Sequence, residues 1–596
     1  MAATASFPAP SLAGHDARKV LWLLFLFCAV TLYSPGDVIE TIRHLRVPDT
    51  DDAMRLVEAR DLAAGQGWYD NVQHRFLPPG GVPSHWSRLL DAPLAGLLLA
   101  LTPLLGPGVA EGIVAAFWPP LLLAVYAAVL FTGVRTTFGP RAAVLALIAA
   151  TQTFGVTVQF AAGRIDHHNV QMIAILGMAT GLIRGGARAG AAAGALAALS
   201  LAIGLEGLPS VALGALYVVG DWVFRGRPAL PCFLGFGLGL GLGAPLLFGA
   251  QTAPHLWTAT ACDALSPPWL WLAGGGGAAA LACAGLDRRL GSMAARFAVV
   301  AAIGAVLVGG FVVLFPVCLG GPFTGMTPLV RDRWLLMVNE MASVPTFFAR
   351  GQWEVLVYYP VLALAALAAS WAAFRGAPAH RRTYGVAALL LWPGLVVGCF
   401  QFRGIYVVSG LIPLVAGPVL DRALALASDR AAAPRRRASL AALGIGLVST
   451  AWMIPAALAG LVKEGGTAAA TAETFACLTD AAVTPLSALP AGTVLAPIVM
   501  GPAILMRTPH AVVAAPYHRA IPGLTAAIEG LGGSEADLRR HVTAHGVRYV
   551  VVCRSRPGPG LDGPAFATRL ARGEAEAGWL EPLPVGGDVL KVWRVH

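Results

Sequence analysis

The stretch GRIDHHN (163–169) places one aspartate and two histidines at the start of an apolar run over 168–184. Of the 596 residues, 57% are hydrophobic and only 12% are charged, yet a second acidic stretch, DTDDAMR (49–55), lies between apolar runs. A water-soluble domain does not bury so much apolar surface, so the sequence predicts a polytopic membrane protein. Carboxylates and imidazoles beside membrane spans cost free energy unless they are paired, metal-bound or hydrated. Both stretches are therefore candidate functional sites.

Fourteen apolar segments are candidate spans, and the basic residues between them indicate the topology. The arginine clusters all fall on the cytoplasmic side when segment 92–106 is a helix at the outer interface instead of a span. That segment has fifteen residues and two prolines, which suits an interfacial helix. With an uncleaved first span and a cytoplasmic N-terminus, thirteen spans remain: 20–35, 108–133, 140–158, 168–184, 188–205, 208–224, 229–250, 268–286, 294–317, 354–374, 383–400, 404–420 and 438–461.

This topology collects the polar parts of the chain on one face of the membrane. We expect an all-α transmembrane domain over 1–461, with external loops at 36–91 and 319–353, and a small periplasmic α/β domain over 462–596. The tail supports this because it contains a helix-like and a strand-like segment, at 534–541 and 547–553.

The net charge of +10 does not indicate nucleic-acid binding, because the basic residues lie in short clusters between apolar segments. The eight cysteines show no CxxC spacing, so neither a zinc site nor a thioredoxin motif is predicted. Cys477 and Cys553 lie in the polar tail, where a periplasmic location would allow them to pair. The others lie in or beside apolar segments and are expected to be packing residues: Cys28, Cys232, Cys262, Cys283, Cys318 and Cys399.

Four candidate ligands share the outer face in the predicted topology, namely Asp49, Asp166, His168 and Glu340. Asp166 and His168 are two residues apart, so both reach one centre only if the backbone there is non-helical. Oxygen ligands with one imidazole suit Mg²⁺ or Mn²⁺, and the imidazole favours Mn²⁺. The alternative interpretation is structural, because an aspartate at a helix start is also a common cap and a lone glutamate is often ion-paired.

Two further stretches carry polar side chains at the outer face. Arg403, in QFRG, stands at the mouth of a predicted span. There it would help a bound cation to offset the charge of a diphosphate leaving group, or it would only anchor the helix at the interface. In the tail, RTPHAVVAAPYHR (507–519) is dense in aromatic, imidazole and basic groups. It either contacts a sugar or acceptor or forms an ordinary surface turn.

At these residues the chain resembles the GT-C superfamily of polyprenyl-linked glycosyltransferases, and within it the catalytic subunit of oligosaccharyltransferase. Asp49 stands six residues before Arg55, as a catalytic Asp precedes an Arg in that family, and LPPGGVPSHWSRLLD (77–91) is similar to its following stretch. GRIDHHN matches the archaeal form of the second metal motif, Asp-x-His. MVNE (337–340) is similar to the motif that supplies the family's catalytic Glu.

The resemblance implies roles for individual residues. Asp49 and Glu340 would be catalytic and, with Asp166 and His168, would hold Mn²⁺ or Mg²⁺. Arg403 and Arg164 would bind the donor phosphate. Acceptor or sugar contacts would come from Asp52, Arg55, His85, Trp86, Tyr517, His518 and Arg519.

The chain also departs from the family. It contains no two adjacent tryptophans and so lacks the WWD motif that reads the glycosylation sequon in oligosaccharyltransferases. Met337 stands where that family has Ser or Thr. The predicted activity is thus transfer of a sugar or oligosaccharide from a polyprenyl-phosphate or -diphosphate donor, at the periplasmic face of the bacterial inner membrane, to a glycan, lipid or protein. The alternatives are a transporter or flippase of lipid-linked sugars, and a non-catalytic envelope assembly protein.

Overall fold

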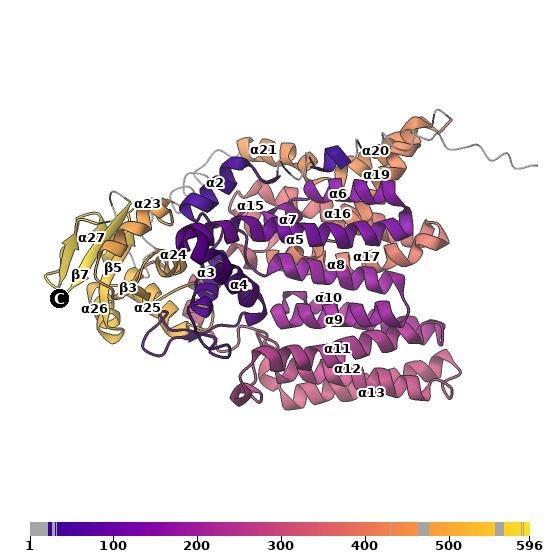
Figure 1. Cartoon of the computed structure of the whole chain (residues 1–596), viewed down its shortest axis with the longest axis horizontal. Coiled ribbons are helices and arrows are strands. Elements are labelled where there is room, and N and C mark those ends of the chain that lie inside the picture. The colour runs from indigo at the N-terminus through magenta and orange to yellow at the C-terminus, as the bar shows by residue number, and fades with distance from the viewer. Residues whose placement is uncertain are drawn as a thin grey trace, which may run out of the picture.

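The computed structural model describes residues 19, 22–26, 30, 32–429, 431–462, 476–554, 565–585, 587 and 589–596. Figure 1 shows a body of long helices that lie side by side, with a small sheet domain at one end of it. The first helices after the N-terminal region pack at the junction between body and sheet domain. This arrangement places the two acidic stretches close to the C-terminal domain, although several hundred residues separate them in the chain.

The body consists of helices that are apolar along most of their length. Several begin with proline in the first turn, where the missing N–H costs nothing. On α13 no residue is buried by protein, as expected for a helix that faces lipid. The long helices are α5 (Pro107–Phe138), α8 (His168–Arg184), α9 (Ala187–Ile203), α10 (Leu208–Arg225), α11 (Leu230–Gln251), α12 (Pro267–Leu286), α13 (Met293–Leu314), α16 (Tyr359–Arg375), α17 (Pro378–Phe400) and α19 (Ile412–Ser428).

Three predicted spans are bent pairs of helices. Helix α6 (Pro140–Thr151) meets α7 (Phe154–Thr157) and η1 (Val158–Phe160) at 71°. The pair formed by η8 (Phe402–Ile405), α18 (Tyr406–Ser409) and α19 bends by 56°, and α20 (Pro434–Gly446) meets η9 (Ser449–Trp452) and α21 (Met453–Val462) at 88°. The first and second bends bring Asp166 and Arg403, respectively, to the same end of the body.

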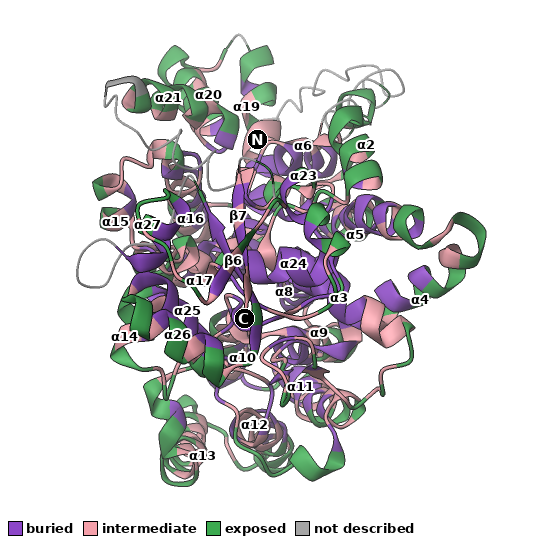
Figure 2. Ribbon diagram, turned by 90° about the vertical axis from the view of Figure 1, so that its left-hand side faces the viewer, coloured by how far each residue is buried: buried purple, intermediate pink, exposed green. Residues whose placement is uncertain are grey.

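Within the described residues, eight helices are long and apolar enough to cross a membrane, or eleven if each bent pair is one span. The sequence predicted thirteen spans. Two of these are the shorter helices α8 and α9, and the first, 20–35, lies only partly within the described residues. Helix α4 (Arg88–Leu105), predicted to be interfacial, passes the length and hydropathy test. In Figure 2 it runs sideways from the body, whereas α12 and α13 are seen end on.

Close packing of small residues fixes α9 against α11. A Cβ on Gly194 would lie 2.2 Å from the carbonyl oxygen of Phe236, and one on Gly235 would lie 2.3 Å from that of Ala187. Only glycine permits such backbone approach, as in many membrane helix pairs. Because α9 is held this tightly, the short helix that follows it, η2 (Leu205–Gly207), has a fixed position at the end of the body.

The external segments are short elements joined by loops. The first loop contains α2 (Pro35–His44), α3 (Thr50–Ala63), β1 (Val72–Gln73) and β2 (Val82–Pro83), followed by α4. A short η3 (Pro254–Leu256) lies between α11 and α12. The loop after α13 contains η4 (Pro316–Gly320), α14 (Pro328–Arg333), η5 (Leu335–Met337), η6 (Asn339–Met341), α15 (Val344–Ala349) and η7 (Trp353–Val357).

The C-terminal domain is a five-stranded sheet of order β4-β3-β5-β7-β6 with helices packed against it. The first three strands are parallel and the last two run antiparallel to their neighbours. The predicted α/β character is confirmed, since β5 covers 547–553 and α26, capped by Ser534, covers most of 534–541. The elements are α23 (Asp480–Val483), η10 (Thr484–Ala488), β3 (Thr493–Leu495), η11 (Ile498–Met500), α24 (Gly501–Arg507), β4 (Ala511–Val512), α25 (Ile521–Gly532), α26 (Glu535–Ala544), β5 (Val547–Cys553), α27 (Phe566–Ala571), β6 (Leu580–Leu583) and β7 (Leu590–Val595).

The first external loop continues this sheet. Val512 of β4 donates its N–H to the carbonyl of Arg75 at 2.8 Å and accepts from the N–H of Leu77 at 2.7 Å. Phe76 thereby pairs with Val512 in parallel fashion beyond the edge of the sheet. An edge strand otherwise leaves such groups unpaired, so residues 75–77 cover this edge and join the two domains.

Two disulfides lie at the same end of the molecule. Cys477 and Cys553 are joined, as a periplasmic tail would allow. Cys262 and Cys318 are joined as well, so their expected role as packing residues was wrong: both lie in loops that follow the ends of apolar helices. Among the described cysteines, Cys232, Cys283 and Cys399 are free.

Candidate functional site

A cavity of about 2230 Å³ lies where the helical body meets the external loops and the C-terminal domain. Its wall includes Asp49 and Asp51 from the first loop, His167 and His168 from the start of α8, and Glu340 from the loop after α13. All three regions that the sequence placed on the outer face thus contribute to one cavity.

Asp52 holds the second acidic stretch in place. Its carboxylate accepts the backbone N–H groups of Ile165 and Asp166, both at 2.8 Å, and a hydrogen bond from Arg164 Nη1 at 3.1 Å. Gly163 has a φ of +85°, which glycine adopts without strain. Helix α8 begins only at His168, so Asp166 lies on non-helical backbone and can face the same centre as His168.

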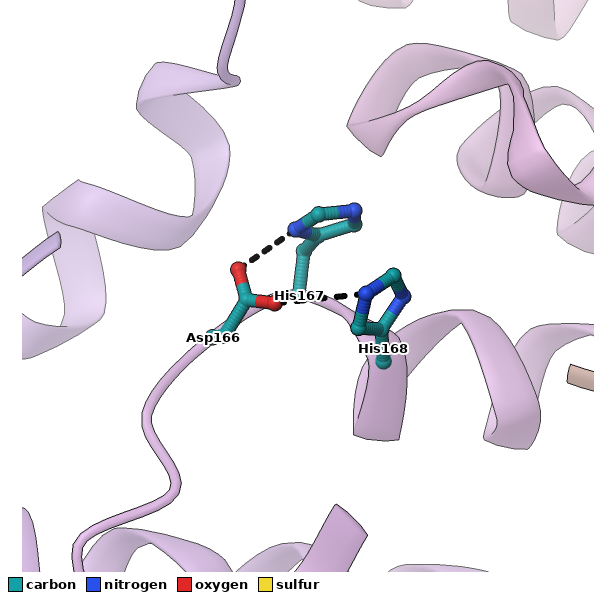
Figure 3. A group of neighbouring side chains, drawn as sticks. All are labelled: Asp166, His167 and His168. Atoms are coloured by element: carbon teal, nitrogen blue, oxygen red, sulfur yellow. Dashed lines mark hydrogen bonds and ion pairs between the residues drawn. The ribbon is translucent and has the colours of Figure 1, made fainter. Parts of the chain in front are cut away.

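Asp166, His167 and His168 form a compact buried group (Figure 3). Asp166 Oδ1 lies 2.5 Å from Nδ1 of His167, and Asp166 Oδ2 lies 3.5 Å from Nε2 of His168. One ligand atom from each residue lies within 4.8 Å of the others. Asp166 Oδ2 and His168 Nδ1 are buried without a hydrogen-bond partner. An unpaired buried carboxylate oxygen beside an imidazole fits a divalent cation.

Asp49 occupies the N-cap position of α3, but its side chain makes no capping bond. One oxygen accepts from Arg164 Nη1 at 3.0 Å and the other from Thr50 Oγ1 at 3.1 Å. The side chain is 38% exposed, toward the cavity. Burial opposes ionisation, but Arg164 outweighs it and lowers the pKa of Asp49. This residue is therefore an accessible, ionised carboxylate.

Glu340 and Arg403 form an ion pair at the cavity wall. Arg403 Nη2 donates to Glu340 Oε2 at 2.7 Å, and Glu340 Oε1 lies 4.0 Å from His168 Nε2. A backbone bond from Phe402 to Ala342, at 3.0 Å, holds η6 against η8. Both residues thus reach the cavity beside the Asp166 group, with Arg403 engaged by Glu340.

The site carries an excess of negative charge. Burial and the neighbouring Asp49 and Asp166 raise the pKa of Asp51 well above its usual range. Burial would also raise the pKa of Asp166, but the two histidines hold it well below the ordinary value. Burial lowers the pKa of His167, but Asp166 and Glu206 raise it to about 10. Such clustered carboxylates favour a bound cation.

Asp52, Arg55 and Arg164 are buried rather than exposed to the cavity. Arg55 donates to Asp91 at 2.7 Å and stacks over the Trp86 ring at 4.6 Å. Asp52 and Arg55 were expected to contact an acceptor or sugar, but both are covered by the fold and absent from the cavity wall. Arg164, expected at the donor phosphate, instead bridges Asp49 and Asp52.

The remaining predicted contacts lie where the C-terminal domain meets the loops. Tyr517 donates its hydroxyl to the Thr50 carbonyl at 3.1 Å. His518 and Arg519 both bind Asp263, each at 2.7 Å. His85, Trp86, Tyr517 and His518 line the cavity, and Arg519 lies behind it. Burial, His518 and Arg519 hold the pKa of His85 well below its usual range, so that imidazole is neutral.

Sequence reasoning missed three cavity residues: Asp51, His167 and Glu206. Asp51 stands two residues after Asp49, and His167 stands inside the Asp-x-His spacing, so both had a local signal. Glu206 follows α9, and its only signal is a carboxylate at the end of an apolar segment. A residue such as Glu206 is recognisable as part of the site only when the structure shows that the end of α9 meets the start of α8.

Solved structures with a similar fold exist, whereas no protein-family model and no curated protein matches the sequence. The oligosaccharyltransferase AglB of Archaeoglobus fulgidus, in complex with an inhibitory peptide and a dolichol-phosphate, superposes with a TM-score of 0.65 at 16% identity. That match covers 90% of this chain and 69% of that one. The apo form of the same protein superposes with a TM-score of 0.65 at 14% identity, over 96% of this chain and 73% of that one. Its complex with Zn and sulfate superposes with a TM-score of 0.56 at 14% identity, over 90% of this chain and 68% of that one. The chain therefore has the GT-C fold of the archaeal oligosaccharyltransferase AglB.

Proposed function

We propose that this protein is a membrane glycosyltransferase that moves a sugar or oligosaccharide from a polyprenyl-phosphate or -diphosphate donor to an acceptor at the outer face. The observation that carries the proposal is the meeting of Asp49, His168 and Glu340 at one cavity, with the buried Asp166 in contact with His167 and His168 of its wall. Four regions distant in sequence supply these groups and Arg403, and the fold is that of a lipid-dependent glycosyltransferase.

Asp166 and His168 would hold a Mn²⁺ or Mg²⁺ ion, with Asp49 and Glu340 facing it across the cavity. When bound, the ion supplies positive charge that offsets the charge of the departing phosphate. Arg403 adds a fixed guanidinium at the same wall. The archaeal oligosaccharyltransferase crystallised with Zn and sulfate has the same fold, which is consistent with an ion site of this kind.

In the transfer, the bond between the sugar and the donor phosphate breaks and its electron pair leaves with the phosphate. A new bond forms from the acceptor atom to the same sugar carbon. Asp49 and Glu340 are the carboxylates that would orient the acceptor and take up its proton. Asp49 suits the orienting part of this role because its side chain is open to the cavity and ionised.

The cavity also extends between apolar helices. Its wall includes Leu208 and Leu213 of α10 and Leu390 and Val397 of α17. Burial of a polyprenyl chain in such surroundings contributes about 0.8 kcal/mol of favourable free energy per methylene. We therefore assign the lipid part of the donor to the space between α10 and α17, with its phosphate toward Arg403.

Two disulfides support the assignment of this cavity to the periplasmic side of a bacterial inner membrane. Disulfides form and persist in oxidising compartments. Cys262, Cys477 and Cys553 all line the same cavity as the candidate ligands. The proposed topology has the C-terminal domain outside and the N-terminus in the cytoplasm.

The direct test measures release of sugar from a polyprenyl-phosphate-sugar donor in detergent, with added Mn²⁺. We expect Asp49→Ala and Asp166→Ala to lower turnover by a hundredfold or more, since removing one transition-state contact costs about that factor. Asp332→Asn, at an exposed ion pair on the same face, serves as the matched control. Unchanged turnover in both site variants would refute the proposal. Movement of the lipid across vesicles without transfer would identify a flippase.

A further inference from the structure

His167 has a carboxylate at each of its two ring nitrogens. Nδ1 lies 2.5 Å from Asp166 Oδ1, and Nε2 lies 3.5 Å from Glu206 Oε2. All three side chains are largely buried, with exposed fractions of 5% for His167, 0% for Asp166 and 20% for Glu206. We propose that Glu206 and His167 are positioning residues that fix Asp166 for binding a divalent cation. This inference rests on the proposed function and adds two residues to its site.

The contacts exclude His167 from the ligand set. A histidine binds a metal through the lone pair of an unprotonated nitrogen. Here Nδ1 is engaged by Asp166 Oδ1 and Nε2 faces Glu206 Oε2, so neither nitrogen is free to face an ion. Although the three side chains are close enough to hold one ion, the groups free to do so are Asp166 Oδ2 and the imidazole of His168.

The bond from His167 also selects which oxygen of Asp166 faces the ion. Oδ1 is occupied by His167 Nδ1, whereas Oδ2 is buried and has no hydrogen-bond partner. The carboxylate therefore cannot rotate without losing a charge-assisted hydrogen bond. Partners of this kind, one step removed from the metal, orient ligands and tune affinity.

Glu206 is held by its own surroundings. Gln171 Nε2, on α8, donates to Glu206 Oε2 at 3.0 Å. A Cβ on Gly204 would lie 2.4 Å from Glu206 Oε2, 2.9 Å from Gln171 Nε2 and 3.3 Å from His167 Cδ2. A side chain at position 204 would therefore displace the ends of Glu206 and Gln171 from their present contacts. Because α9 is packed tightly against α11, η2 presents Glu206 at a constant distance from α8.

The test measures Mn²⁺ binding to the detergent-purified full chain without donor, by calorimetry or by the loss of the free-ion paramagnetic signal. We expect Glu206→Gln to weaken Mn²⁺ binding about 10- to 100-fold, the range for residues that orient a metal ligand. The Mn²⁺ affinity of Glu206→Asp should fall between those of Glu206→Gln and wild type, because aspartate keeps the charge but has a shorter side chain. Gly204→Ala should weaken binding in the same direction, through displacement of an unchanged Glu206.

A positioning role predicts rescue, which a folding defect does not. At saturating Mn²⁺, Glu206→Gln should regain a turnover number within about threefold of wild type, with only the half-saturating Mn²⁺ concentration raised. Asp166→Ala should not be rescued. The midpoint of thermal unfolding without metal should be the same for Glu206→Gln and for the control Asp332→Asn.

The outcomes separate this inference from the proposed function. If wild type binds Mn²⁺ and Glu206→Gln binds it equally well, the positioning role is wrong and the transferase proposal stands. If wild type binds no Mn²⁺ or Mg²⁺, both the cation site and this inference are wrong. If Glu206→Gln unfolds, Glu206→Asp and Gly204→Ala decide, and unchanged Mn²⁺ affinity in these two overturns the inference.

Discussion

At the scale of single residues, the site is held by groups that do not line it. Asp52 anchors two consecutive backbone N–H groups before α8, and Arg164 links it to Asp49. The cavity-facing carboxylate of Asp49 and the buried carboxylate of Asp166 are thus positioned by Asp52, three residues after the first, and by Arg164, two residues before the second.

We expect Asp52→Ala to lower the free energy of unfolding by about 3 kcal/mol, since it leaves two buried N–H groups without a partner and removes one of the two carboxylates that pair with the buried Arg164. Asp52→Asn should cost less, because its amide oxygen can still accept the backbone bonds. Thermal unfolding in detergent, followed by tryptophan fluorescence, measures both. Equal midpoints for Asp52→Ala and wild type would contradict this role.

The candidate ligand residues could be proposed from sequence because each stands in a polar stretch beside an apolar run. The orientation of their neighbours could not. Three of the four residues from Asp49 to Asp52 are aspartates. The helix that begins at Thr50 turns Asp52 inward and leaves Asp51 facing the cavity, and the sequence alone does not show this. Arg55 likewise turns inward, where it pairs with Asp91, 36 residues away in the chain.

At the scale of elements, the loop that carries Glu340 is tied down at its start. The disulfide from Cys262 to Cys318 joins η4 to the loop between α11 and α12, and the ring of Phe323 packs on His518 at 5.3 Å. Sequence reasoning predicted this loop but not its tie, because the two cysteines are 56 residues apart and flank apolar helices.

We expect the double variant Cys262→Ser/Cys318→Ser to speed amide hydrogen exchange in the loop 321–341 by tenfold or more. The cross-link anchors η4, from which this loop continues, and a native disulfide typically contributes 2–4 kcal/mol. Cys399→Ser, at a free cysteine, is the control. Exchange as slow as in the control would show that other contacts hold the loop.

At the scale of the whole molecule, the domains meet through ion pairs as well as through the shared sheet. Asp263 accepts from His518 and from both Nε and Nη2 of Arg519. Burial opposes ionisation of Asp263, but His518 and Arg519 hold its pKa far below the ordinary value. Charge patterning predicted thirteen spans, whereas the described residues contain eight candidate spans, or eleven if each bent pair is one span. It gave no signal for the contact between Asp263 and His518, which are 255 positions apart.

This contact should make the stability pH-dependent. A carboxyl whose pKa is lower in the folded state stabilises it above the unfolded pKa, near 4, and loses that contribution as the pH falls further. Asp263→Asn should therefore lower the free energy of unfolding at pH 7 by about 2 kcal/mol. The difference in this free energy between the variant and wild type should shrink below about pH 4. A difference that stays constant from pH 7 to pH 3 would contradict this assignment.

The strand shared between residues 75–77 and β4 has a consequence for biosynthesis. Translation proceeds from the N-terminus, so the ribosome has made every long helix of the body before Val512 exists. Until then the backbone of Arg75 and Leu77 lacks its partner, and the wall of the cavity contributed by Tyr517 and His518 is missing. A nascent or truncated chain consequently lacks a finished site, and the cavity is complete only when the last hundred or so residues have folded onto the helical body.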